Sequence, residues 1–332
     1  MTPKDFNFNI KNNNIPKYQQ LVDFINDAIA KNLLKKGSLL PSVTSVCLVS
    51  KISRNTVFKA YSILKNQGVI DSVSNKGYYI LGNTRNILLI LDDFNAYKEV
   101  LYQSFVNNLP DNFVVDVQFH HFNIDNFKSI VNNSLGKYYK YIVMNFDNQD
   151  VASVLKSISN DKLLLIDRNI HSNSDSNYVF QDFGKAFYTA LVEAVALFRK
   201  YKSIDFVYPS FAKHPVESIL YFKKFCKEFQ FDYKIITNLN QFKIEKNKAY
   251  ICVDDRLLGE FLEQCKDKNF ELGVDVGFLS YNETPMKKFI YKGISVVSID
   301  FNEFGNKGAE FIIHDTPIQC YLPTKLLLRK SL

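Results

Sequence analysis

The stretch that most constrains the fold is residues 52–81, with the sequence ISRNTVFKAYSILKNQGVIDSVSNKGYYIL. Ser53 is a good N-cap, so the polar residues that follow it fall on the first, exposed turn of a helix. Apolar residues then recur at helical spacing and predict one buried face: Val57, Ala60, Tyr61 and Leu64. Gly68 ends this helix.

A short hairpin follows the helix. Val69 and Ile70 begin a strand, residues 75–77 (Asn-Lys-Gly) form a tight turn, and residues 78–80 return. A helix with a cationic N-terminus followed by a β-hairpin is how a winged helix-turn-helix domain meets DNA, with the helix in the major groove and the hairpin tip at an adjacent groove or at phosphates. An ordinary amphipathic helix and hairpin is the alternative interpretation.

Two further helices are predicted upstream. Apolar residues spaced by three and four follow Pro16, and Lys36-Gly37 stops this first helix. Ser42 caps a second helix over residues 43–49, and residues 50–52 turn into the helix described above. The predicted order is therefore helix, short helix, turn, helix and hairpin.

The net charge of +7 is confined to the first quarter of the chain. Residues 1–82 carry eleven Lys or Arg and four acidic residues, whereas residues 83–332 carry 30 of each sign. A positive module joined to a neutral one is the electrostatic footprint of a nucleic-acid binder, although a solvated basic face would give the same count.

Residues 16–81 resemble the DNA-binding domain of GntR-type bacterial repressors, above all in Leu40-Pro41-Ser42 and in residues 53–57 (SRNTV). The resemblance implies that Arg54 reads a base edge and that Lys76 and Gly77 form the wing contact. The full set of expected DNA-binding residues is Ser42, Thr44, Ser53, Arg54, Asn55, Thr56, Lys59, Lys76 and Gly77.

The chain departs from that family at two positions. It has Val43-Thr44-Ser45 where the family usually has an Arg, and Phe58 where the family often has another. Lys59 replaces part of that charge, but a Lys is a point charge and not a planar fork. We therefore expect more reliance on Arg54 and the wing.

The remainder of the chain alternates strands and helices after a short linker at residues 83–85. This alternation predicts parallel sheets with helices on both faces, and the length suits two lobes with a ligand cleft at the carboxyl ends of their strands. The predicted strands are residues 86–91, 113–119, 139–146, 162–167, 203–208, 233–237, 249–253, 274–279 and 294–299. The main predicted helices are residues 97–108, 124–135, 183–200, 215–229, 256–267 and 304–313.

The local sequences of this module resemble the effector domain of lactose-repressor-type regulators, notably residues 163–168 (LLLIDR) and the tail at residues 322–331. The resemblance implies an α/β two-lobed periplasmic-binding-protein-like (type I) effector domain, preceded here by the winged helix-turn-helix domain. By position it implies these ligand contacts: Asp92, Asp93, Phe94, Arg168, Lys213, Asp255 and Phe301. Carboxylates and Arg suit sugar hydroxyls and an aromatic face suits a sugar ring, although a capping Asp or a core Phe would look the same.

Other functional classes find little support. The chain contains no GxSxG, P-loop or HExxH motif, its five histidines are scattered, and its five cysteines form no CxxC pair. We therefore expect no catalysis, no cofactor and no metal, with His120 and His121 pointing to opposite faces of a strand end. We also expect no membrane span or signal segment, and hence a cytoplasmic protein.

Together these features predict a transcription regulator that binds a palindromic DNA operator as a homodimer and responds to a small molecule. The effector expected from the resemblance is a sugar. Arabinose-repressor-type proteins pair the same two modules, which makes a pentose a candidate. The alternative is a solute-binding or sensor protein with the same α/β fold and no specific DNA target.

Overall fold

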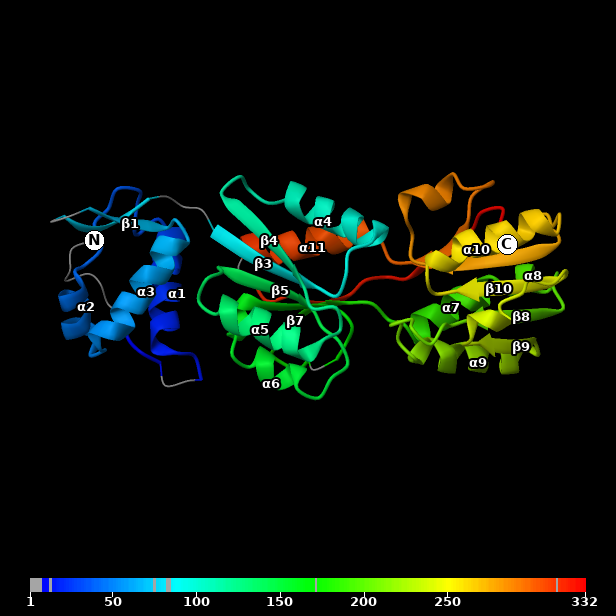
Figure 1. The fold of residues 1–332 in the computed structure, drawn as a ribbon, viewed down its shortest axis with the longest axis horizontal. Helices are drawn as coiled ribbons and strands as arrows, with labels where there is room; N and C mark the ends of the chain where they lie inside the picture. The colour runs from blue at the N-terminus through cyan, green and yellow to red at the C-terminus, as the bar shows by residue number, and fades with distance from the viewer. Residues whose placement is uncertain (1–7, 12–13, 74–75, 82–84, 171, 315) are drawn as a thin grey trace. The chain divides into compact units, whose positions relative to one another are not determined.

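The structure is a computed structural model that describes residues 8–11, 14–73, 76–81, 85–170, 172–314 and 316–332 (Figure 1). The chain divides into two compact units. The first unit comprises Met1–Phe94, Val106–Val179 and Gly308–Gln319, and the second comprises Asn95–Phe105, Phe180–Lys307 and Cys320–Leu332. Each unit is therefore assembled from segments that are far apart in the sequence.

The first unit begins with the predicted three-helix module, which we call the head (Figure 1). Its elements are α1 (Lys17–Ala30), α2 (Val43–Ser50), α3 (Arg54–Asn66), β1 (Ile70–Val73) and β2 (Gly77–Ile80). Helix α1 ends at Ala30, before the predicted stop at Lys36-Gly37. Asn32 adopts a left-handed backbone with φ of 56°, which turns the chain out of the helix.

The head has its own apolar core, built from the inner faces of α1, α2 and α3 and closed by the hairpin. The phenol of Tyr61 lies inside this core and donates a 2.7 Å hydrogen bond to the carbonyl of Pro41. A bridge between Leu39 and Tyr79 adds a short third strand to the hairpin. These contacts fix α3 relative to α2 and to the hairpin.

The first unit also contains a six-stranded sheet with the order β13-β7-β6-β5-β3-β4. Its strands are β3 (Arg85–Leu91), β4 (Phe113–Phe119), β5 (Lys140–Met144), β6 (Leu163–Asp167), β7 (Asn177–Phe180) and β13 (Gln319–Tyr321). Neighbouring strands from β4 through β3 and β5 to β6 are parallel, so their carboxyl ends meet at one edge of the sheet. The helices of this unit are α5 (Ile124–Ser134), α6 (Val151–Leu155) and η1 (Asn160–Lys162).

The second unit contains another six-stranded sheet, with the order β14-β12-β11-β10-β8-β9. All its pairs are parallel except β12 with β14. The strands are β8 (Ser203–Val207), β9 (Asp232–Ile236), β10 (Lys248–Cys252), β11 (Val276–Tyr281), β12 (Ser295–Ser298) and β14 (Lys325–Leu327). The helices are α4 (Ala96–Asn107), which lies in this unit as far as Phe105, α7 (Lys185–Glu193), α8 (Val195–Phe198), α9 (Glu217–Phe229), η2 (Leu239–Gln241), α10 (Arg256–Asp267) and η3 (Pro285–Lys288). Helix α11 (Phe301–His314) begins in this unit, and its residues from Gly308 onward belong to the first.

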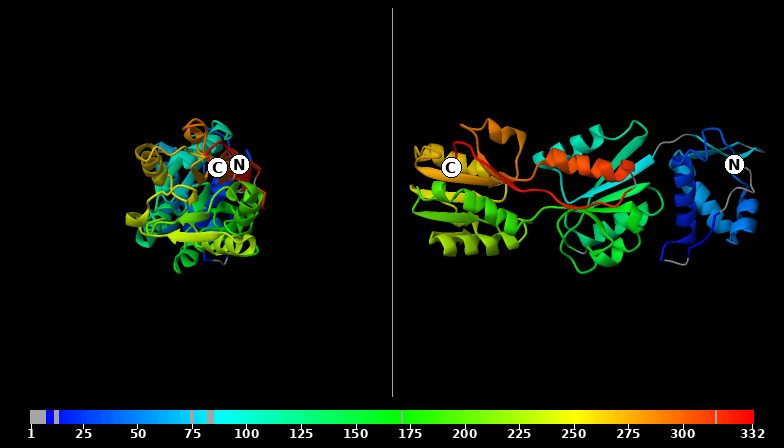
Figure 2. Two further views of the ribbon diagram at one scale, coloured as in Figure 1. Left: turned by 90° about the vertical axis from the view of Figure 1, so that its right-hand side faces the viewer. Right: turned by 180° about the vertical axis from the view of Figure 1, so that it is seen from behind.

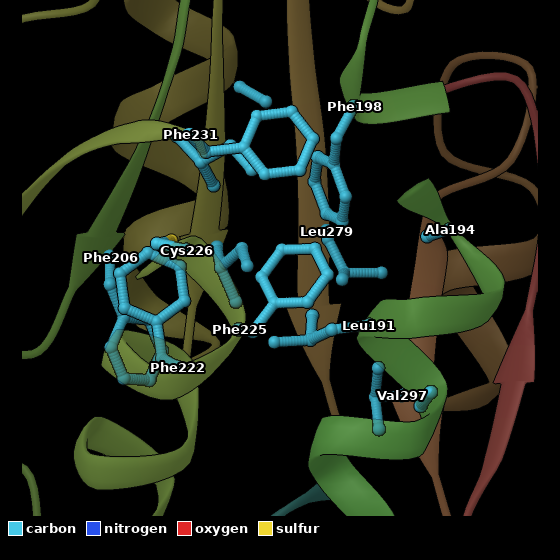
Figure 3. Close-up of a cluster of buried hydrophobic side chains, with 14 of the residues drawn as sticks. Leu191, Ala194, Phe198, Phe206, Phe222, Phe225, Cys226, Phe231, Leu279 and Val297 are labelled. Carbon is cyan, nitrogen blue, oxygen red and sulfur yellow. The ribbon is translucent and has the colours of Figure 1, made fainter. Parts of the chain in front are cut away.

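Both faces of this second sheet are covered. Alternate residues of β10 pack into different clusters: Ile251 joins the side chains of α7 and α9, whereas Tyr250 joins those of α10. Figure 3 shows the first cluster, in which Phe225 lies beside Leu191 and the rings of Phe206 and Phe222 lie next to each other. Burial on both faces explains why the strands are continuous apolar runs and not alternating ones.

Helix α11 lies beside α4 (Figure 2). The hydroxyl of Ser104 donates a 2.7 Å hydrogen bond to the carbonyl of Asn302. A Cβ atom at Gly305 would lie 2.5 Å from the carbonyl oxygen of Leu101, so this close approach of the two helices requires a glycine.

The predicted fold class is confirmed, with local differences. The helix predicted over residues 183–200 is interrupted at Ala194, which separates α7 from α8. Short strands β7, β13 and β14 were not predicted. Of the expected linker, residues 83–84 lie outside the described residues, and Arg85 is already the first residue of β3.

Candidate functional site

The exposed face of α3 presents the residues expected to read DNA. The hydroxyl of Ser53 accepts a 3.2 Å hydrogen bond from the backbone N–H of Thr56 and lies 2.8 Å from the Thr56 hydroxyl. This cap starts the helix at Arg54, so that the side chains of Arg54 and Asn55 are exposed on its first turn. Ser53 and Thr56 thus serve first to position α3, whereas Arg54 and Asn55 can reach outward.

Helix α2 begins in the same way. The hydroxyl of Ser42 accepts a 3.1 Å hydrogen bond from the backbone N–H of Ser45. Thr44 is exposed on the first turn of α2. A capped helix start of this kind suits a phosphate contact, because its remaining N–H groups point along the helix axis toward an anion.

Lys59, another expected DNA contact, is exposed on α3, and its ammonium group lies against a side chain of a neighbouring helix. Its ammonium group lies 3.8 Å from the centre of the Tyr18 ring, which belongs to α1. Lys65 is also engaged: it lies 2.8 Å from Asp71, and the hydrogen bond to that carboxylate raises the pKa of Lys65. Lys59 was expected to replace part of the charge of the arginine that Phe58 replaces. Its ammonium group instead packs on the ring of Tyr18 in α1.

The wing tip is partly described. Gly77 has a φ of +95°, a backbone conformation that favours glycine, and Lys76 is exposed beside it. The predicted tip residue Asn75 lies outside the described residues. Lys76 and Gly77 stand at the start of β2, at the end of the hairpin where the resemblance places the wing contact.

In the first unit, the predicted ligand residues lie at the carboxyl edge of the sheet. Asp92, Asp93 and Phe94 follow β3 directly, and Arg168 follows β6. One strand, β5, separates β3 from β6, so their ends are about 10 Å apart at the usual strand spacing. The Nε atom of Arg168 lies 3.6 Å from Oδ2 of Asp167.

Asn145 occupies the gap between these residues and was not predicted. It follows β5, is only 2% exposed, and donates from Nδ2 to the carbonyl of Ile170. Among the described residues its Oδ1 atom has no hydrogen-bond partner. A buried amide oxygen without a partner is costly unless something else donates to it. The signal in the sequence was a polar residue directly after the apolar run of β5.

The two adjacent histidines point in different directions, as predicted. His120 is buried: its Nδ1 accepts from the backbone N–H of Phe122 at 3.0 Å, so its Nε2 donates to the carbonyl of Met144 at 2.9 Å. His121 is exposed and stacks on Phe119, with 5.9 Å between ring centres. Within the described residues, no group of three His, Cys, Asp or Glu side chains could hold a metal ion.

In the second unit, Asp255 stands at the start of α10, at the carboxyl edge of the sheet. Its Oδ1 atom lies 2.6 Å from Nζ of Lys287, which also donates to the carbonyls of Tyr281 at 3.0 Å and Asn282 at 2.6 Å. Burial lowers the pKa of Lys287 despite this carboxylate. The predicted ligand acceptor Asp255 is therefore also the counter-ion of a buried amine.

The other two predicted ligand residues of this unit have different environments. Lys213, in the segment after β8, is exposed. Phe301 is buried, and its ring lies 4.7 Å from that of Tyr97. The ring of Phe301, which was expected to cover a sugar, is thus packed against a neighbouring side chain. This is the packing of a core Phe, the alternative to a ligand contact at this position.

A charged group that the sequence did not single out lies beside Asp255. Arg256 donates from Nε and Nη2 to the two carboxylate oxygens of Asp254, at 2.9 and 2.6 Å, and its guanidinium lies 4.3 Å from the centre of the Phe211 ring. Burial would raise the pKa of Asp254, but the hydrogen bonds from Arg256 hold it below its ordinary value. Asp254 is therefore ionised at neutral pH.

Among the described residues we find no helix that is both long and apolar enough to span a bilayer.

The fold and the exposed start of α3 define a class of protein: a winged helix-turn-helix domain followed by an α/β domain of two mostly parallel sheets. Residues 17–80 match the family described as "Bacterial regulatory proteins, gntR family". The chain is 32% identical over 74 residues to the HTH-type transcriptional repressor YtrA of Bacillus subtilis, a match that covers 22% of this chain and 57% of that protein. The chain thus spans a little over half the length of that relative.

The chain is also similar to solved structures of transcription regulators. The trehalose repressor from Escherichia coli superposes with a TM-score of 0.63 at 13% identity, covering 73% of this chain and 99% of that one. A LacI family transcriptional regulator from Enterococcus faecium with bound ribose superposes with a TM-score of 0.60 at 15% identity, covering 74% of this chain and 98% of that one. At this level of identity the similarity establishes the fold.

Proposed function

We propose that this chain is a ligand-responsive transcription regulator that binds a DNA operator through its head and a small metabolite through its α/β domain. The observation that carries the proposal is the exposed start of α3, where Ser53 caps the helix and leaves Arg54 and Asn55 pointing outward from a basic domain. The gntR match over residues 17–80 supports the same role.

The ligand is a sugar in this proposal, and a pentose is the first class to test. Two of the similar structures support a sugar: one is a trehalose repressor, and another holds ribose. The carboxyl edge of the first unit offers Asp92, Asn145 and Arg168, which together accept and donate hydrogen bonds as vicinal hydroxyls require.

The regulator acts as a cytoplasmic homodimer and has no catalytic activity. Two copies place two α3 helices on the half-sites of a palindromic operator. The α/β domain has two arrangements, and a ligand that binds one of them more tightly shifts the protein toward it. The resulting change in operator affinity is limited by the difference between the ligand's affinities for the two arrangements, and corresponds to about 1–3 kcal/mol. Sedimentation of the full-length protein should give twice the mass of one chain, and a single-chain mass at working concentrations would contradict the dimer.

The experiment that tests the DNA role compares two Arg-to-Ala variants. Arg54→Ala removes the proposed base contact, whereas Arg199→Ala removes an exposed arginine of the second unit that stacks on Phe231. We expect Arg54→Ala to weaken binding to a selected operator by about 5- to 150-fold, since one bidentate base contact contributes about 1–3 kcal/mol, and Arg199→Ala to leave it unchanged. Equal binding by both variants would contradict the proposal, and a solute-binding protein would select no operator at all.

A further inference from the structure

The outward face of α3 carries one large apolar side chain that the head does not need for its own core. Phe58 is 45% exposed, while Val57 and Tyr61 on the opposite face are fully buried. Phe58 stands one turn after Arg54, and the guanidinium carbon of Arg54 lies 5.9 Å from the centre of its ring. The two side chains thus form a continuous strip along the exposed face of the helix.

The two lysines of α3 each have a partner away from Phe58. Lys59 is held against the Tyr18 ring, and Lys65 against Asp71. The face therefore combines a hydrogen-bonding end at Arg54 and Asn55 with an apolar end at Phe58. A purely electrostatic contact with the phosphate backbone would not require an aromatic ring at this place.

The major groove of DNA offers one apolar feature that such a ring can recognise. Base edges there are hydrogen-bond donors and acceptors, except for the C5-methyl group of thymine, which side chains such as Phe contact. Four residues of helix rise about 6 Å, which is close to the separation of two base pairs. The ring therefore reaches a base one or two positions away from the base that Arg54 contacts.

We infer that Phe58 is a specificity-determining residue that packs on a pyrimidine C5-methyl group next to the base contacted by Arg54. The inference rests on the proposed function, in that α3 must enter the major groove. It goes further by stating which chemical group of the operator is read and which side chain reads it. The methyl group can belong to thymine or to 5-methylcytosine, and the experiment separates the two.

The test begins with an operator selected by the full-length protein from random duplexes. Each thymine of one half-site is then replaced in turn by uracil, which removes the methyl group and leaves base pairing unchanged. We expect the wild-type protein to bind about fourfold more weakly at one or two positions, the change that burial of one methyl group predicts. Phe58→Ala should bind thymine and uracil operators equally at those positions.

Two further comparisons test the contact between Phe58 and the methyl group. Phe58→Leu keeps an apolar side chain and should retain part of the preference for thymine, whereas Ser62→Ala, at the next exposed turn of α3, should keep all of it. At the responding position, a cytosine should be bound more weakly than a 5-methylcytosine by the wild-type protein and equally by Phe58→Ala. A preference for thymine together with equal binding of the two cytosines would assign the contact to thymine alone.

The outcomes separate the inference from the proposed function. If uracil weakens the wild type and Phe58→Ala equally at every position, or weakens neither, the inference is wrong although the protein binds DNA. If the full-length protein selects no duplex, the proposed function fails and the inference fails with it. Because Phe58 is exposed, its variants should keep the melting temperature of the wild type, which circular dichroism checks.

Discussion

The ammonium group of Lys287 lies 2.6 Å from Oδ1 of Asp255 and joins η3 to the start of α10. The Lys287 side chain is only 1% exposed, whereas that of Asp255 is 42% exposed. Two backbone carbonyls accept the remaining donors of Lys287. Asp255 thus balances a buried charge and also faces solvent. A substitution at this position therefore affects both the stability of the protein and the binding of any ligand there.

Asp255→Ala should destabilise the protein because it leaves the buried ammonium of Lys287 without its counter-ion. Removing one partner of a fully buried pair costs about 3–5 kcal/mol, and the half-exposed carboxylate of Asp255 reduces this to about 2 kcal/mol. Urea unfolding measures the loss. The double variant Asp255→Ala with Lys287→Met removes both charges and should recover most of the stability; equal stability of the single variant and the wild type would contradict the role of the pair.

The stability of the protein should rise with pH through the titration of Lys287. Burial lowers the pKa of this side chain below its ordinary value of 10.5. Between the lowered pKa and 10.5 the unfolded chain binds more protons than the folded protein, so the free energy of unfolding increases with pH in that window. Lys287→Met should lack this increase. If the free energy of unfolding of the wild type and of Lys287→Met changed in parallel from neutral pH to pH 10, the prediction would be wrong.

A second buried ion pair lies within the first unit, where Nζ of Lys162 is 2.7 Å from Oδ1 of Asp23 in α1. Burial raises the pKa of Asp23 although Lys162 opposes the shift. Lys162→Met should therefore destabilise the protein by about 3 kcal/mol at neutral pH, and by less as the pH falls and the unpaired carboxyl group is protonated. Unfolding at pH 7 and pH 5 measures the difference.

The control for this pair replaces both charges. Asp23→Leu combined with Lys162→Met puts apolar side chains of similar size in the two positions and should be about as stable as the wild type. A loss from Lys162→Met that does not change with pH, or a double variant as unstable as the single one, would show that the charge of Asp23 is not what Lys162 balances.

Asn145 should be required for the response to a sugar. A saturating ligand at 100 times its Kd stabilises the folded protein by about 2.7 kcal/mol, which thermal melting detects. Asn145→Leu keeps the volume but removes the buried amide, so the shift in melting temperature should be lost. Asn133→Leu is the matched control, because Asn133 lies near the end of α5, away from the carboxyl edge. An undiminished shift in Asn145→Leu would exclude this residue from the ligand site.

The head could be predicted closely because its signals are local. The cap at Ser53, the apolar spacing of α3 and the turn at Gly77 are each set by residues a few positions apart. Asn145 could also have been found, since a polar residue directly follows the buried run of β5. The alternation of strands and helices along residues 86–332 was enough to predict the fold class of the α/β domain.

The side-chain environments could not be predicted because they depend on partners distant in sequence. The ring of Tyr18 holds Lys59 from another helix, and Lys287 finds Asp255 only after the sheet has formed. The break between α7 and α8 at Ala194 has no Gly or Pro to mark it. The edge strand β13 is too short to carry a pattern of its own.

The sheet of the first unit takes its last strand from near the end of the chain, which matters while the protein is being synthesised. Strand β7 ends at Phe180, and its neighbour β13 begins at Gln319. At about 10 residues per second, the ribosome needs on the order of ten seconds to pass from one to the other. A nascent chain therefore completes the head well before the sheet of the first unit can close, and a prematurely terminated chain would carry the head without the edge strand of that sheet.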